Sequence, residues 1–186
     1  IPAPFIRTDE VTFRVNMSST FNVFQAAVTL GMKRIVWGSS ETTLGLPFDR
    51  EKPDYAPIDE NQTPYPESTY ALSKLLSEEM ARQYNRWTGI PIVGLRISNI
   101  MEPHDYQRFP SFWPDPMLRK WNLWGYGDAR DVAQACRLGP EANISGAEIF
   151  IIAASDTCMT TKNQDLMAAV YPQVEIRGHI GDYKTL

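Results

Sequence analysis

A tyrosine and a lysine four residues apart could carry out proton transfer in this chain. Tyr70 and Lys74 lie in the stretch STYALSK, at residues 68–74. On a helix, residues four apart are neighbours on one face, so the phenol and the ammonium would stand side by side. A neighbouring cation favours the ionised form of an acid, and it would lower the pKa of the phenol from about 10. Such a tyrosine can exchange protons with a substrate near neutral pH.

Small polar residues follow two short apolar runs, where they could join this pair. Ser39 and Ser40 end the run RIVWGSS, and Asn99 follows the run PIVGLRIS. Both runs are typical of buried parallel strands. Ligands of open α/β sheets bind outside the carboxyl ends of the strands. We therefore expect these side chains to meet Tyr70 and Lys74 at one edge of a sheet.

The order of the expected elements predicts an α/β fold. Apolar residues recur at helical spacing over residues 9–30 and 68–87, and the two apolar runs cover 34–40 and 91–98. Alternating helices and strands favour a parallel sheet. The loop over 38–67 is long for a plain connection, which is typical of a functional segment. Further along, the pattern predicts a helix at 128–138, a strand at 148–154, a short helix ending at 170 and a final strand at 174–177.

Residues 101–127 differ from the rest of the chain in being rich in proline and aromatic residues. Two interpretations stay open for them: the core of a small cap, or an aromatic wall that faces a ligand.

Composition narrows the class of partner. The chain has 186 residues, 43% of them hydrophobic, and can bury the core of one domain with a small appendage. Its net charge is -4, with acids and bases interspersed, which argues against a nucleic-acid surface or a membrane-binding tail. The two cysteines lack metal-ligand spacing, and the two histidines are isolated, so we expect no metal site and a reducing cytoplasmic compartment. Small molecules are the expected partners.

Five motifs, in order along the chain, resemble those of the extended short-chain dehydrogenase/reductase family, specifically its NAD-dependent epimerase/dehydratase members. They are VNMSSTFNVFQAA, KRIVWGSSETTLG, YPESTYALSKLLSEE, GLRISNIMEP and GYGDARDVAQA. The resemblance covers about residue 11 to the C-terminus. It implies a Rossmann-type parallel sheet with flanking helices, and it implies NAD or NADP as cofactor, with NAD favoured. A homodimer is also expected from the resemblance alone.

The resemblance implies roles for the candidate residues. Tyr70 is similar to the catalytic acid/base, and Lys74 to the residue that lowers its pKa and holds the nicotinamide ribose. Ser40 resembles the hydroxyl that hydrogen-bonds the reacting oxygen, and Ser39, the less suited of the two serines for that role, is expected near the cofactor. Asn16 resembles a helix asparagine close to the family's active site, although a structural side chain that bonds the backbone fits it equally well.

Other positions are expected to contact the cofactor or the substrate. Ile100 resembles the backbone turn that meets the nicotinamide carboxamide, and Asn99 resembles a substrate contact. Family dehydratases carry a carboxylate two places after the serine or threonine, where this chain has Thr42. Dehydration is therefore disfavoured, although Glu41, one place earlier, keeps it open. Glu41 and Thr42 are expected to line the substrate site, with a loop carboxylate as the alternative for Glu41.

Arginines could bind the phosphates of a nucleotide sugar. Arg108, Arg119 and Arg130 are the candidates, and we favour Arg108 and Arg130, with plain surface arginines as the alternative.

The implied reaction removes a proton and a hydride from one carbon of a nucleotide sugar or related polyol. An epimerase would return the hydride to the other face, a dehydratase would eliminate a neighbouring group, and a dehydrogenase would release the ketone. A reductase of small aldehydes or ketones is the alternative within the enzyme class.

One departure from the family concerns the cofactor. None of the 11 glycines forms the G-x-G-x-x-G turn that receives the pyrophosphate of a dinucleotide. We expect residues 1–100 to form the C-terminal part of a Rossmann-type domain, and residues 101–186 to form a substrate-binding portion that returns one or two strands to the main sheet. The chain is then a piece of a longer enzyme, one half of a site completed by another chain, or a non-catalytic fragment that does not bind cofactor by itself.

Overall fold

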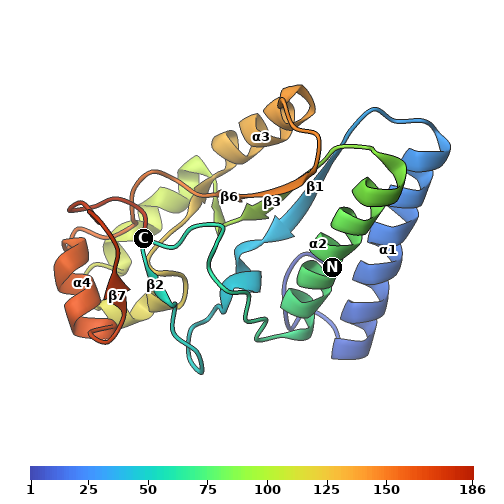
Figure 1. Ribbon diagram of the computed structural model, residues 1–186. Coiled ribbons are helices and arrows are strands. Elements are labelled where there is room, and N and C mark those ends of the chain that lie inside the picture. Colours follow the sequence, from blue (N-terminus) through green and yellow to red (C-terminus); the bar gives the residue numbers. More distant parts are fainter.

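The computed structural model describes all residues from Ile1 to Leu186, and its centre is a parallel sheet. The sheet contains β1 (Ile35–Ser40), β3 (Ile92–Ile97) and β6 (Ala147–Ile152), in the order β1-β3-β6. Both pairings are parallel and in full register, so that all three strands end level with one another. Figure 1 shows these strands at the middle of the molecule. The predicted α/β fold is confirmed, and strand β6 does return to the main sheet.

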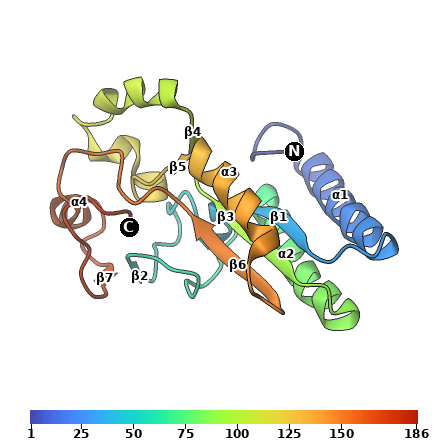
Figure 2. The ribbon, with the colours of Figure 1, turned by 90° about the horizontal axis from the view of Figure 1, so that it is seen from above.

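Helices cover both faces of the sheet. Helices α1 (Asp9–Thr29) and α2 (Thr69–Thr88) pack together on one side, and α3 (Ala129–Leu138) crosses the other side (Figure 2). The limits of all three helices lie within one residue of those predicted from the sequence. The polypeptide therefore alternates between strand and helix as the apolar pattern indicated.

Local sequence signals fix the ends of α2, the helix that carries the tyrosine and the lysine. At its start, the Ser68 hydroxyl accepts a hydrogen bond from the Ala71 N–H at 3.1 Å. This capping contact satisfies one of the amides that a helix leaves free. At its end, Gly89 adopts a φ of 72°, a left-handed conformation that glycine takes without steric cost. The start of α2, and with it the first helical turn, is thus set by Ser68.

The apolar core has two parts. A cluster of five buried residues, which includes Phe24, Tyr84 and Ile92, lies between the sheet and the paired helices α1 and α2. A larger cluster of 16 buried residues joins the loop after β1 to the C-terminal third of the chain, from Leu44 to Leu186. Most of the aromatic segment 101–127 packs into or against this larger cluster, as the cap interpretation predicted. The proposed boundary at residue 100 stays a prediction.

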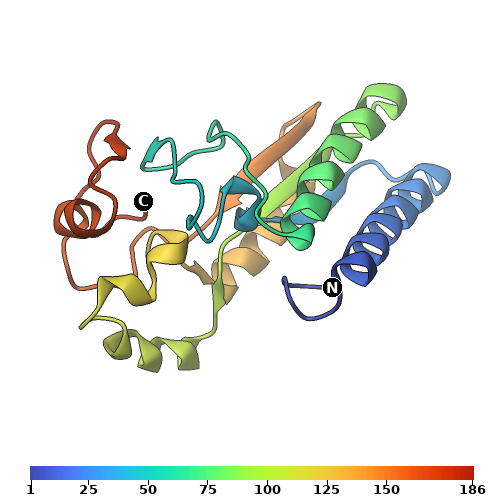
Figure 3. The same ribbon diagram turned by 90° about the horizontal axis from the view of Figure 1, so that it is seen from below.

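The segment after β3, the loop that carries β2 (Tyr55–Ala56) and the residues after β6 form a lobe beside the sheet, at the left of Figure 3. Here β2 pairs in parallel with β7 (Glu175–Ile176), and β4 (Ile100–Met101) pairs with β5 (Gly127–Asp128). Helix α4 (Asn163–Val170) packs at its outer side. The predicted strand at 174–177 thus forms, but it joins β2 instead of the main sheet.

Short 3-10 helices complete the chain: η1 (Glu41–Leu44), η2 (Pro103–Ser111), η3 (Pro116–Leu118), η4 (Lys120–Asn122) and η5 (Gly139–Glu141). None of the helices combines the length and the apolar character needed to cross a lipid bilayer.

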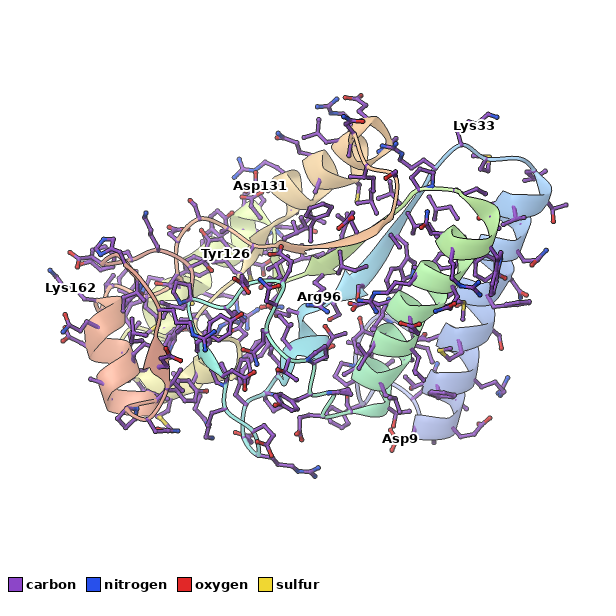
Figure 4. The ribbon with its side chains drawn as sticks, in the orientation of Figure 1. Asp9, Lys33, Arg96, Tyr126, Asp131 and Lys162 are labelled. Carbon is purple, nitrogen blue, oxygen red and sulfur yellow. The ribbon has the colours of Figure 1, made fainter.

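A buried ion pair joins α2 to the sheet. Arg96 donates to Glu78 through Nε at 3.0 Å and through a terminal nitrogen at 2.8 Å, and the two side chains are 3% and 0% exposed. The Ser39 hydroxyl donates to the same carboxylate at 2.6 Å. Figure 4 labels Arg96 in the interior, whereas Lys33 and Lys162 lie at the periphery. The Glu78 carboxylate on α2 therefore links this helix to Ser39 on β1 and to Arg96 on β3.

Replacing Glu78 with glutamine is expected to lower the free energy of unfolding by about 3–5 kcal/mol, because the Arg96 charge would stay buried without a counter-charge. Denaturant unfolding measures the change. Glu79→Gln is the matched control, since Glu79 pairs with Arg82 on the exposed face of the same helix. We expect it to leave stability nearly unchanged. Equal losses in the two variants would contradict a structural role for the buried pair.

Candidate active site

The carboxyl ends of β1 and β3 meet the start of α2 around a cavity of about 620 Å³. Eighteen residues line it. Among them are these residues predicted from the sequence: Ser39, Ser40, Glu41, Thr42, Tyr70, Lys74, Asn99 and Ile100. The structure thus brings together, at the predicted edge of the sheet, residues that are up to 61 positions apart in the sequence (39 to 100). The volume lies within the range of small-molecule sites.

Ser40 is oriented by its own loop. Its Oγ accepts hydrogen bonds from the Thr42 backbone N–H at 3.2 Å and from the Thr42 hydroxyl at 3.0 Å. Because a serine oxygen has two acceptor lone pairs, these contacts leave the Ser40 proton as the group available to another partner. That hydroxyl interacts with the phenol of Tyr70, which is 6% exposed. Ser40 is therefore set up as a donor toward the place that Tyr70 faces.

The ammonium of Lys74 does not lower the pKa of Tyr70 in this structure, contrary to the expectation from the spacing. Lys74 Nζ donates to the Gly38 carbonyl at 2.7 Å and lies 5.7 Å from the centre of the Tyr70 ring. Burial raises the pKa of Tyr70, ionised Glu41 raises it further, and the contact with Ser40 only partly opposes these effects. Burial likewise lowers the pKa of Lys74. The pKa of Tyr70 is therefore set mainly by burial. The ammonium of Lys74 does not offset this effect, because it is directed at the backbone of β1.

Glu41, the first residue of η1, lines the cavity and has a pKa far from its ordinary value. Burial raises the pKa of this carboxyl to about 7. The Ser98 hydroxyl, the Arg119 charge and the backbone of Asn99 lie close enough to offset part of that rise. Glu41 takes part in none of the salt bridges of the protein. A carboxyl of this kind can hold or release a proton near neutral pH.

Arg119, which bonds the cavity residue Asn99, is only 6% exposed. Its terminal nitrogens donate to Asn99 Oδ1 at 3.0 Å and to the Gly125 carbonyl at 2.9 Å. Its guanidinium lies 5.3 Å from the Phe112 ring and 4.8 Å from the Trp121 ring. Arg119 thus orients Asn99, and Trp121 brings one aromatic ring of the cap to the cavity wall.

Arg108 and Arg130, which the sequence favoured, do not line the cavity. Arg130 pairs with Asp128 at 2.6 Å and its side chain is 70% exposed. Arg108 is 66% exposed and faces Asp105. The residue types and their spacing do not separate these arginines from Arg119, since Arg108 also lies between aromatic residues, Tyr106 and Phe109.

Two more candidates have structural partners. Asn16 does not line the cavity, and its Nδ2 donates to Ser73 Oγ at 3.2 Å, which in turn donates to the Tyr70 carbonyl at 2.7 Å. Asn16 therefore braces the backbone of α2 behind Tyr70. Ser39 lines the cavity, but its hydroxyl donates to Glu78.

Comparisons with known proteins find a family profile and individual relatives. Residues 5–153 match the sequence profile described as the NAD dependent epimerase/dehydratase family. The chain is 30% identical over 122 residues to an NAD-dependent glucose-6-phosphate dehydrogenase of Haloferax volcanii, covering 60% of this chain and 46% of that protein. It is 30% identical over 132 residues to a putative UDP-glucose 4-epimerase of Methanocaldococcus jannaschii, covering 69% and 42%. The chain thus spans less than half the length of these two relatives.

A solved structure has the same fold. A short-chain dehydrogenase/reductase superfamily protein from Agrobacterium tumefaciens, with bound NAD, superposes with a TM-score of 0.67 at 20% identity. The superposition covers 98% of this chain and 68% of the other.

Replacing Glu41 with glutamine is expected to stabilise the protein at alkaline pH. An acid whose pKa is about 7 when folded and near 4.5 when unfolded binds more protons in the folded state between these values, so stability falls as pH rises through this window. Glutamine removes the effect, which amounts to about 3 kcal/mol above pH 7. Denaturant unfolding at pH 5 and pH 8 measures it: the gain from Glu41→Gln should be larger at pH 8. An equal gain at both pH values would show that Glu41 has an ordinary pKa.

Proposed function

The chain belongs to the NAD-dependent epimerase/dehydratase family, and on that basis we propose that it carries the catalytic site of an oxidoreductase or epimerase that acts on a hydroxyl of a nucleotide sugar or related polyol. The observation that carries the proposal is that Tyr70, Lys74 and Ser40 share one cavity at the carboxyl end of a parallel sheet. Of these, Tyr70 exchanges the proton and Ser40 donates to the reacting oxygen.

The residues of the cavity fit the nicotinamide end of the cofactor. Lys74 uses one of its three N–H donors on Gly38, which leaves two donors for a ribose diol. Ile100, 48% exposed at the rim, offers its backbone to the carboxamide. No glycine-rich turn is present to receive a pyrophosphate, so the fit ends at the nicotinamide half. When bound, the nicotinamide ring supplies the hydride acceptor or donor that the side chains lack.

The protonation states of Tyr70 and Ser40 indicate which group donates a proton and which group hydrogen-bonds the reacting oxygen. Burial keeps the proton on Tyr70 in the free cavity, so the phenol is ready to donate to a carbonyl oxygen. In the opposite direction Tyr70 takes the proton of a substrate hydroxyl, which requires its pKa to fall. The Ser40 hydroxyl, held by Thr42, steadies the oxygen in both directions.

Several observations favour a sugar over a small carbonyl compound. A cavity of about 620 Å³ is larger than a small aldehyde needs, and Asn99 with Trp121 offers a polar group and a ring to a polyol. The two relatives are named for glucose 6-phosphate and UDP-glucose. Thr42 in place of a carboxylate favours epimerisation or dehydrogenation over dehydration. A reductase of small aldehydes or ketones remains the second candidate within the enzyme class.

We propose a homodimer formed by α1 and α2. The two helices expose large apolar side chains, among them Phe21 (48%), Leu72 (39%) and Leu76 (39%). A reducing, cytoplasmic setting stays a prediction, based on the two unpaired cysteines Cys136 and Cys158.

The fit to half of the cofactor leads to a binding experiment. Nicotinamide mononucleotide should bind to the protein and adenosine monophosphate should not, as measured by calorimetric titration. Lys74→Ala should weaken the binding of the mononucleotide about tenfold, because two charge-assisted donors are lost. Lys33→Ala, which alters an exposed lysine at the periphery of the molecule (Figure 4) that does not line the cavity, is the matched control. Equal binding of both mononucleotides would contradict the assignment of the cavity.

Turnover tests the catalytic role of Tyr70. In an assay with NAD and UDP-glucose, Tyr70→Phe should lower turnover by at least about a hundredfold, because the ring remains and only the proton-transfer group is lost. Tyr183→Phe, at a tyrosine that is 45% exposed, should leave turnover unchanged. A Tyr70→Phe protein as active as the parent would exclude this mechanism.

A further inference from the structure

Lys74 is a partly buried cation without an acidic partner. Its Nζ donates to the Gly38 carbonyl at 2.7 Å, and its side chain lines the cavity. Lys74 takes part in none of the salt bridges of the protein. Taking an ammonium out of water costs free energy unless other groups replace its hydration. The structure must therefore supply such groups without using a carboxylate.

Two aromatic rings lie beside the Lys74 ammonium. Its Nζ is over the Trp37 ring, 5.5 Å from the ring centre, and over the Tyr70 ring, 5.7 Å from the ring centre. The face of an aromatic ring carries partial negative charge and attracts a cation within about 6 Å, and indole is the strongest of the aromatic side chains in this respect. Trp37 and Tyr70 therefore replace, with neutral groups, part of the hydration that Lys74 loses.

The position of Trp37 on β1 places its indole under α2. Side chains alternate between the two faces of a strand, so Trp37 lies on the same face as Ser39, which donates to Glu78 on α2. In the register of the sheet, Trp37 is opposite Gly94 of β3. A side chain at residue 94 would collide with Ile149 and would touch the Trp37 ring at 3.5 Å. Gly94 therefore leaves room for Ile149 beside the indole.

Packing from α1 fixes the orientation of the indole. Phe24 on α1 is fully buried and meets Trp37 edge to face, with ring centres 6.2 Å apart and an interplanar angle of 78°. Trp37 is one of the partly buried residues that pack against the smaller apolar cluster. A ring that is held in one orientation can in turn hold a cation at one place over its face.

No carboxylate competes with the two rings for Lys74. Glu78, one helical turn further along α2, is occupied by Arg96 and Ser39. Glu41 is the one acidic residue that lines the cavity, and it forms no salt bridge with Lys74. Burial lowers the pKa of Lys74, and no opposite charge offsets that effect. The charge of Lys74 therefore stays uncompensated and acts on whatever occupies the cavity.

We propose that Trp37 is a positioning residue for Lys74, and that its indole face holds the ammonium in place without cancelling its charge. A carboxylate in the place of the indole would also hold the ammonium, but it would neutralise the charge that an oxygen of a ligand meets. The indole attracts the cation and has no net charge of its own. The consequence for cofactor binding rests on the proposed function, whereas the contact between Trp37 and Lys74 requires neither cofactor nor substrate.

Titration of Lys74 tests the proposal on the ligand-free protein. With lysine labelled at the carbon next to Nζ, NMR follows each ammonium with pH, and Lys74→Ala identifies the Lys74 signal. Trp37→Leu removes the ring face that favours the charged form, so it should increase the acid dissociation constant of Lys74 about fivefold. Trp37→Phe keeps a weaker ring face and should increase that constant only about twofold.

Trp87→Leu is the matched control. Trp87 lies on α2, is 58% exposed, does not line the cavity and has the Arg86 guanidinium 5.9 Å from its ring centre. This variant therefore removes an indole and a cation–π contact elsewhere on the same helix, and it should leave the Lys74 constant unchanged. Equal constants in the parent and Trp37→Leu proteins would overturn the proposal. Equal changes in Trp37→Phe and Trp37→Leu would overturn it too, because packing and not the ring face would then be responsible.

A second measurement keeps Trp37 and so does not depend on a Trp37 variant that folds. Ring currents move the signals of protons over a ring face to lower chemical shift, so the methylene protons next to Lys74 Nζ should resonate at lower shift than those of the exposed Lys33. Equal shifts for Lys74 and Lys33 would overturn the proposal.

Cofactor binding separates this proposal from the proposed function. Nicotinamide mononucleotide should bind about threefold more weakly to Trp37→Leu than to the parent protein, because the ammonium is held less firmly. Calorimetric titration measures this change. An altered Lys74 titration with unaltered binding of the mononucleotide would support the role of Trp37 and would refute only the assignment of Lys74 to the cofactor.

Discussion

The ion pair between Glu78 and Arg96 is the constraint on which the site depends. Glu78 lies one helical turn after Lys74 and two turns after Tyr70, so the three side chains form one stripe along α2. Because Glu78 is fixed to β3 through Arg96 and to β1 through Ser39, this stripe must face the ends of the strands. A rotation of α2 that moved Tyr70 out of the cavity would leave two charges buried without partners.

This arrangement differs from that of a simple amphipathic helix. The buried residues of α2 include apolar ones such as Tyr84 together with the polar Ser73, Ser77 and Glu78, whereas Leu72 and Leu76 are each 39% exposed. The polar face can be buried because each group finds a partner: Ser73 and Ser77 donate to carbonyls of the preceding turn, and Glu78 has its arginine. The apolar face is left for another surface to cover. The periodicity of α2 therefore locates the helix correctly, but a hydrophobic-inside rule would orient it wrongly.

Local sequence signals predict the helix limits and the edge of the sheet where the site lies, but they do not predict burial or tertiary contacts. Helix limits follow from local signals such as Ser68 and Gly89, and the edge of the sheet gathers Ser40, Tyr70 and Asn99 because parallel strands end together. Arg119, by contrast, comes from a segment without periodicity, so nothing in the spacing relates it to Asn99. The pKa of Tyr70 also escapes sequence reasoning, since a spacing of four predicts a nearby cation but not the burial that opposes it.

The contacts that hold Tyr70 and Lys74 come from α2 and the sheet. Ser68 caps α2, Ser73 bonds the backbone of Tyr70, and Gly38 holds Lys74. None of these contacts involves a glycine-rich phosphate-binding turn, which the chain lacks. The geometry of proton transfer and the binding of the adenosine half of a dinucleotide are therefore physically separable. The first is set by buried hydrogen bonds between α2 and the sheet, and the second by backbone amides at a different strand end. The positions of Tyr70 and Lys74 thus depend on contacts between α2 and the sheet, and not on a phosphate-binding turn.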